Sequence, residues 1–240
     1  MHRGVLLISI LLGFAFLAPA SSVNQEFSDF TTPLPLKPGD TLILGIVGGW
    51  ERWDAPQRGV RKTALQLRDM KLPGVYVETV ENHKLNLATQ LVDRAFPQDA
   101  SHTSRVIVYG HSLGGPAAVR LAHELDDKGV NVLALVLIDA VGHPRPIPPN
   151  VRVAANFFQR DSCPVCGAKS ITAEDPARTN ILGNLQWKYR DRHVDIHTEP
   201  WVRRFFVREH EMMEFDPEMW AEVKKIIVNA VTGSSQVRQP

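Results

Sequence analysis

The sequence has no marked excess of charge of either sign. Lysine and arginine total 27 against 26 aspartates and glutamates. Residues 1–22 contain a single charged residue, Arg3, so the chain without them balances at 26 against 26. A neutral chain offers no electrostatic footprint for nucleic acid or for an anionic membrane, and we expect neither as a partner. Beyond residue 22 no apolar run approaches the roughly 20 residues that span a bilayer, so we expect no stable membrane insertion.

The N-terminus differs in composition from the rest of the chain. His2 and Arg3 precede a stretch, residues 5–17, that is apolar except for a serine and a glycine, and Ala-Pro-Ala-Ser-Ser follows. A basic start, a short apolar segment and small residues in an A-x-A pattern are typical of a secretory signal peptide. We therefore expect residues 1–22 to be removed on export, to a secreted or periplasmic location, and the apolar segment is too short to favour an anchor.

Cysteine is scarce, with only Cys163 and Cys166 present, in the sequence Cys-Pro-Val-Cys. They lie in a loop-like stretch rather than in a strand-to-helix turn, which argues against a thioredoxin-like redox pair. No second pair of cysteines or histidines is suitably spaced for zinc, so we expect no metal site. In an exported protein the two cysteines are most simply explained by a short disulfide that stiffens one loop.

Strand-like and helix-like segments alternate from residue 41 onward. Buried-strand patterns occur at residues 41–47, 75–80, 105–109, 132–138 and 151–158, with a weaker sixth at 185–189. Helical spacing of apolar residues occurs at 55–70, 84–96, 113–128 and 219–231. This alternation predicts an α/β fold, with a mostly parallel central sheet of about six strands and helices on both faces. We expect one domain over residues 23–232, with no room for a cap domain, and a disordered tail over 233–240.

Gly110-His111-Ser112-Leu113-Gly114 lies between a predicted strand and a predicted helix. A G-x-S-x-G sequence in that context predicts a nucleophile elbow, a sharp turn that exposes the serine hydroxyl above the sheet. The glycines leave room for strand and helix to approach closely. His111 directly precedes the serine, so we expect its side chain to point away from the hydroxyl and to pack near the turn.

The segment Tyr-Gly-His-Ser-Leu-Gly-Gly resembles the elbow of lipases, esterases and thioesterases of the α/β-hydrolase superfamily, and the similarity in element order covers roughly residues 41–230. The resemblance implies a serine, acid and histidine triad in that chain order, which needs no cofactor. For the acid, Asp139 at the end of strand 132–138 is favoured over Asp161 after strand 151–158. For the base, His193 is favoured, with His197 and His210 as alternatives.

The oxyanion hole is expected to combine the amide of Leu113 with one from the loop after the first strand, where Gly49 and Trp50 are the candidates. The sequence thus predicts a serine hydrolase, of esterase or lipase type, that forms an acyl-enzyme on Ser112 with a small-molecule or lipid ester or a thioester. A non-catalytic binding protein of the same fold and an acyltransferase remain alternatives. The sequence leaves the oligomeric state open.

Overall fold

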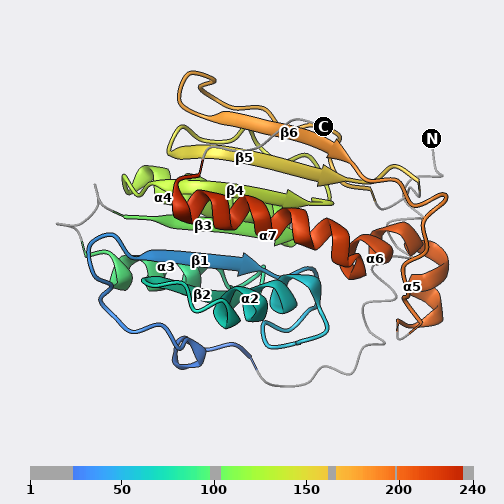
Figure 1. Ribbon diagram of the computed structural model, residues 1–240, viewed down its shortest axis with the longest axis horizontal. Helices are drawn as coiled ribbons and strands as arrows, with labels where there is room; N and C mark the ends of the chain where they lie inside the picture. The colour runs from blue at the N-terminus through green and yellow to red at the C-terminus, as the bar shows by residue number, and fades with distance from the viewer. Residues whose placement is uncertain (1–23, 98–103, 162–165, 198, 235–240) are drawn as a thin grey trace, which may run out of the picture.

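The computed structural model describes residues 24–97, 104–161, 166–197 and 199–234. Its centre is a six-stranded sheet in the order β2-β1-β3-β4-β5-β6, and every neighbouring pair of strands is parallel (Figure 1). The strands are β1 (Thr41–Ile46), β2 (Val75–Val80), β3 (Val106–His111), β4 (Val132–Ile138), β5 (Val151–Phe158) and β6 (Asn180–Gln186). All carboxyl ends of the strands therefore meet at one edge of the sheet, where open α/β sheets bind their ligands.

Helices cover both faces of the sheet. On one face α3 (Leu85–Ala95) and α4 (Gly114–Asp127) bury their apolar sides, and on the other α2 (Gly59–Asp69) and α7 (Pro217–Thr232) do so. Side chains alternate across the strands, so Leu42 and Leu44 join the first apolar cluster while Ile43 joins the second. Burial on both faces explains why the central strands are almost wholly apolar.

Two short helices, α5 (Trp201–Phe206) and α6 (Arg208–Phe215), lie between the last strand and α7 (Figure 1). Asp216 fixes where this segment ends. Its carboxylate caps α7 by accepting from the amides of Glu218 and Met219, and it also accepts from the side chains of Trp187 and Tyr189. The chain after β6 is thereby fastened to the start of α7, and α6 is held beside the carboxyl ends of the strands.

The predicted α/β-hydrolase architecture is confirmed, because the sheet is parallel, helices cover both faces and the described residues contain no cap domain. The predicted sixth strand is misplaced, since β6 spans Asn180–Gln186 instead of 185–189. Its sequence NILGNLQ contains two asparagines and a glycine, residues that strands disfavour, and it lies at the sheet edge. The helix expected from residue 55 begins only at Gly59, and α5 and α6 were not predicted.

Three predictions fall wholly or partly outside the described residues: the signal peptide over 1–22, the disulfide, through Cys163, and the tail from 235 onward. They stay predictions. Among the helices that the structure describes, none combines the length and the apolar character that crossing a membrane requires.

Candidate active site

The turn after β3 is a tight elbow with Ser112 at its apex. Ser112 has φ 56°, a left-handed conformation that a serine adopts only under constraint. Its amide donates to the Ile138 carbonyl at 2.9 Å, and its carbonyl accepts from Gly115 and Val141. A Cβ on Gly114 would lie 2.2 Å from the Ile46 carbonyl oxygen, so no side chain fits there. These contacts fix the strained turn and leave the Ser112 hydroxyl at the carboxyl edge of the sheet.

Three side chains converge at this elbow from distant parts of the chain. The Nε2 atom of His210, on α6, lies 3.0 Å from Oγ of Ser112, and its Nδ1 lies 2.6 Å from Oδ2 of Asp139. Asp139 directly follows β4. A hydroxyl bonded to an imidazole, which is in turn bonded to a carboxylate, is the arrangement that activates a serine as a nucleophile.

Asp139 is fully buried and its carboxylate is surrounded by donors. Oδ1 accepts from the amide of Gly167 at 2.6 Å and from that of Gln159 at 3.3 Å, and Oδ2 also accepts from the Gln159 side chain. Like Ser112, Asp139 has a positive φ, here 41°. These bonds aim Oδ2 at His210 and compensate the burial of the charge.

The histidine and the carboxylate each shift the pKa of the other. Burial disfavours the charge on both, yet the hydrogen bond and the opposite charge outweigh it. The pKa of His210 is therefore raised and that of Asp139 lowered from their ordinary values. An Asp139 that stays ionised holds the His210 proton on Nδ1 and leaves Nε2 free to accept the Ser112 proton.

The prediction that His193 meets the serine is wrong in this structure, because His210 occupies that place. His193 is exposed on the segment after β6, and His197 is exposed and pairs with Asp195 at 2.6 Å. Asp161, the alternative acid, accepts from the amide of Tyr189, whereas the favoured Asp139 contacts the histidine. Chain order alone did not separate His193 from His210, since both follow the last strand.

The sequence around His210 carries no signal that separates it from the other two histidines. His210 is flanked by Glu209 and Glu211, although the buried pair Met212-Met213 follows. His193 and His197 likewise stand beside buried apolar residues, Val194 and Ile196.

The loop after β1 lies next to the elbow. The Leu113 side chain contacts Gly49, where a Cβ would stand 2.8 Å from it. Glu51 accepts from the amide of Gly48, and Asn82 donates to the Gly48 carbonyl. Within the described residues the amides of Leu113, Gly49 and Trp50 donate no hydrogen bond. Leu113 directly follows the nucleophile and its side chain meets Gly49, so the amides of Leu113, Gly49 and Trp50 stay the candidates for the oxyanion hole.

A buried group of charged side chains lies beneath the triad, with Arg58 at its centre. Its guanidinium lies 3.2 Å from Glu199, 3.4 Å from Glu211 and 3.9 Å from Glu51. Arg203 reaches the same Glu199 and Glu211 at 3.5 and 3.4 Å. This network joins the loop after β1, which carries the oxyanion candidates, to the helix that carries His210.

Glu51, His111 and Glu214 each offer one ligand atom within 4.8 Å of the others, the set among the described residues that could hold a metal ion. One oxygen of each carboxylate already accepts a backbone hydrogen bond, from Gly48 and from Gly59. The guanidinium of Arg58 stands 3.9 Å from Glu51 and opposes a second cation at that point.

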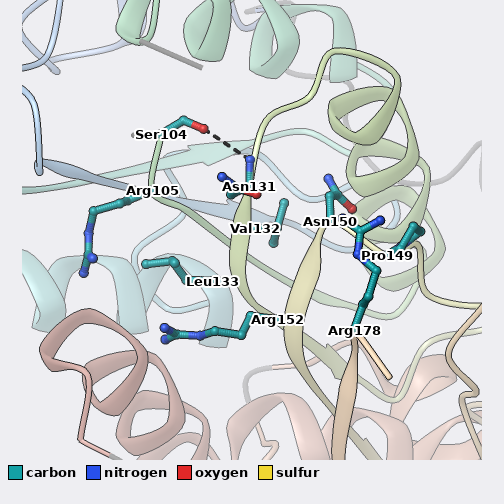
Figure 2. Close-up of a pocket in the computed structure, with 9 residues that line it drawn as sticks. All are labelled: Ser104, Arg105, Asn131, Val132, Leu133, Pro149, Asn150, Arg152 and Arg178. Carbon is teal, nitrogen blue, oxygen red and sulfur yellow. Dashed lines mark hydrogen bonds between the residues drawn. The ribbon is translucent and has the colours of Figure 1, made fainter. Parts of the chain in front are cut away.

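A cavity of about 490 Å³ lies at the amino ends of the strands, whereas Ser112 follows the carboxyl end of β3. The cavity is lined by residues that precede β3, β4, β5 and β6 and by early residues of β4 and β5 (Figure 2): Ser104, Arg105, Asn131, Val132, Leu133, Pro149, Asn150, Arg152 and Arg178. Two of its arginines are engaged at the end of α7, where Arg105 donates to the Val231 carbonyl and Arg152 to that of Ala230. Figure 2 shows no convergence of these cations on one point, and we assign the cavity no part in the chemistry.

Comparison with known proteins found no matching family model and no matching curated protein. Similar solved structures include a cutinase-like protein from Cryptococcus sp., 15% identical, with 82% of this chain and 97% of that one covered at a TM-score of 0.47.

Two thioesterases are also similar in structure. The type II thioesterase BorB from the borrelidin biosynthetic cluster is 12% identical, with 82% and 95% of the two chains covered and a TM-score of 0.44. The RedJ thioesterase of the prodiginine biosynthetic pathway in Streptomyces coelicolor is 12% identical, with 88% and 97% covered and a TM-score of 0.43. At these levels similarity does not transfer an activity, so the functional argument depends on the residues at the elbow.

Proposed function

We propose that this protein is a serine hydrolase that cleaves carboxylic ester or thioester bonds through an acyl-enzyme on Ser112. The observation that carries the proposal is the continuous chain of hydrogen bonds from Ser112 through His210 to Asp139, at 3.0 and 2.6 Å. Non-catalytic proteins have no need to hold a serine in a strained backbone conformation with its hydroxyl against an imidazole.

In the proposed reaction Oγ of Ser112 attacks the carbonyl carbon while Nε2 of His210 takes its proton. Asp139 holds the His210 tautomer and stabilises the imidazolium. The amide of Leu113, with that of Gly49 or Trp50, binds the oxyanion. His210 then returns the proton to the leaving alcohol or thiol. Water, deprotonated by the same histidine, releases the acid from Ser112.

Exposed apolar side chains beside the elbow favour an apolar acyl group. Leu113 is 38% exposed directly after the nucleophile, and Trp50 is 68% exposed in the neighbouring loop. Exposed large apolar side chains next to reactive groups are typical of binding surfaces for apolar ligands. We propose that this substrate is met outside the cell, after removal of residues 1–22.

A fluorophosphonate probe tests the nucleophile, because it labels a serine only where a neighbouring base activates it. The wild-type protein should be labelled at Ser112 and should hydrolyse short p-nitrophenyl esters. Ser112→Ala should abolish both, whereas Ser170→Ala, at an exposed serine, should abolish neither. Wild-type turnover in Ser112→Ala would refute the proposal. A folded wild-type protein that takes up no label would instead be a binding protein.

The histidines provide a matched pair of variants. His210→Gln should lower kcat by several orders of magnitude, since among the described residues no other side chain forms a hydrogen bond with Ser112 Oγ. His193→Gln changes an exposed side chain and should retain activity within about twofold. The reverse result would restore His193 as the base. Product analysis with an added alcohol would detect acyl transfer to an acceptor other than water.

A further inference from the structure

One face of the His210 ring is covered by a second histidine. The rings of His111 and His210 are stacked, with centroids 4.8 Å apart and an interplanar angle of 26°. His111 ends β3, immediately before the nucleophile, and is almost completely buried. The proposed reaction uses none of its atoms.

Behind His111 stands a carboxyl group, Glu214, on the same helix as His210 and one turn further along. Its Oε1 accepts from the amide of Gly59 at 2.6 Å, and its Oε2 lies 2.6 Å from Nδ1 of His111. The angle of the second contact is not that of a ring N–H bond, and Oε2 and both His111 nitrogens have no aligned hydrogen-bond partner. Glu214, His111 and His210 thus form a continuous series of contacts that ends at the Ser112 hydroxyl.

This buried pair is costly to the fold. Burial raises the pKa of Glu214 to about 7 and lowers that of His111 to about 4. A carboxyl whose pKa is higher in the folded than in the unfolded state makes folding less favourable as the pH rises from its ordinary value to the raised one. Groups that cost stability and lie against reacting atoms are candidates for a functional role.

Several other charged or titratable groups surround His210, and they differ from Glu214 in how they are neutralised. They come from β3 and β4, from the loop after β1 and from the segment before α7: His111, Asp139, Glu51, Arg58, Glu199, Arg203 and Glu211. Glu211 has Arg58 and Arg203 within 3.4 Å, and Glu51 has Arg58 at 3.9 Å. Among the described residues, no arginine lies within ion-pair distance of Glu214. The charge of Arg58 still acts on Glu214 from further away and partly offsets the rise that burial causes in its pKa.

Resting on the proposed function, we propose that Glu214 is a positioning residue for the reaction. Through the stacked ring of His111 its carboxylate holds His210 in place and favours the imidazolium that forms when Ser112 gives up its proton. His111 remains neutral in this arrangement, because a second positive charge 4.8 Å away would oppose protonation of His210. Neither residue touches the substrate.

The variant Glu214→Gln tests this role, because glutamine keeps the acceptor for Gly59 and removes the charge. The midpoint of the acid limb of kcat/KM should fall by about one pH unit, since a negative charge that favours protonated His210 is lost. At the plateau, kcat should fall about threefold to tenfold while KM changes less than twofold. The control Glu222→Gln, an exposed glutamate on α7, should reproduce the wild-type profile.

A second readout does not depend on turnover. In ¹⁵N-histidine-labelled Ser112→Ala protein the titration of His210, assigned by loss of its signal in His210→Gln, should move to lower pH when Glu214→Gln is added. His111→Phe, which keeps a flat ring against His210 but removes the nitrogens, should shift it in the same direction. If Glu214→Gln left the midpoint of the His210 titration unchanged in folded protein, the proposal would be overturned.

Stability separates this role from a merely structural one. Glu214→Gln should be more stable than the wild type at pH 8 and about equally stable at pH 5, because only the glutamate loses stability as it ionises. A purely structural residue would give a less stable variant at both pH values, with an unshifted acid limb. If Ser112 did not take up the fluorophosphonate, the proposed function would be wrong. The proposed effect of Glu214 on the pKa of His210 would still be tested by the titration.

Discussion

Arg58 is the cation at the centre of the buried network, and its replacement by methionine would leave carboxylates in the interior with too little positive charge. Its guanidinium is 3.2 to 3.9 Å from Glu199, Glu211 and Glu51. Removing one partner of a buried ion pair typically costs about 3–5 kcal/mol. Arg203 still reaches two of the three carboxylates. We therefore expect the low end of that range, about 3 kcal/mol, for Arg58→Met at pH 8.

The loss should depend on pH, and its sign follows from the carboxylates. Burial already raises the pKa of Glu51 and Glu211, and without the guanidinium both would rise further. A carboxyl with a raised pKa costs the fold stability when it ionises and little while it is protonated. Arg58→Met should therefore lose less stability at pH 5 than at pH 8. Urea unfolding at the two pH values measures this difference.

The matched control is Arg52→Met. Arg52 pairs with Asp54 at 2.7 Å, but both side chains are more than a third exposed, and such pairs contribute at most about 1 kcal/mol. If Arg58→Met cost less than 1 kcal/mol at pH 8, or the same at both pH values, the interpretation of the network as a charge-balanced unit would be refuted. A loss equal to that of Arg52→Met would refute it as well.

Three further variants or conditions test the site and its support. Asp139→Asn should lower kcat about 10⁴-fold, the loss that the same exchange causes in a serine protease by favouring the wrong histidine tautomer. In the same ester assay the kcat of Asp161→Asn should stay within about twofold of the wild-type value. The acid limb of wild-type kcat/KM should have its midpoint above about 6.5, the ordinary pKa of imidazole, because the neutral His210 is lost as the pH falls through its raised pKa. A midpoint at or below about 6.5 would contradict the Asp139 contact. Gly114→Ala should lower the urea midpoint of unfolding sharply, since its Cβ would stand 2.2 Å from the Ile46 carbonyl oxygen and overpacking costs about 1–3 kcal/mol or more. In the control Gly129→Ala nothing lies within 4 Å of the added Cβ, so this variant should cost only the strain of its positive φ.

The sheet and the elbow could be predicted from the sequence because local patterns encode them. The strands β1 to β5 are apolar runs that parallel sheets bury on both faces, and Ser112 and Asp139 stand directly after two of them. Where a strand ends, its next side chain reaches the ligand-binding edge, so position along the chain already determined their place in space.

His210 could not be predicted in the same way, since nothing local fixes the segment that carries it. The sequence of α6, REHEMMEF, shows weak amphipathic spacing and begins without a side-chain cap. Its position comes from tertiary contacts: Asp139 bonds the imidazole, His111 stacks on it and Asp216 ties the following turn to β6. Similarly, β6 was misplaced because an edge strand rich in asparagine owes its pairing to β5 more than to its own propensity.

The spacing of the triad along the chain has a consequence for biosynthesis. His210 is 98 residues from Ser112 and 71 from Asp139, and every strand of the sheet precedes it. A ribosome therefore makes all six strands, the serine and the acid before it makes the proton acceptor. Under the proposed function a chain that stops short of residue 210 cannot hydrolyse an ester, because it lacks the base. Reactivity then depends on the last-made part of the domain, once the helix that bears the imidazole has packed against the elbow.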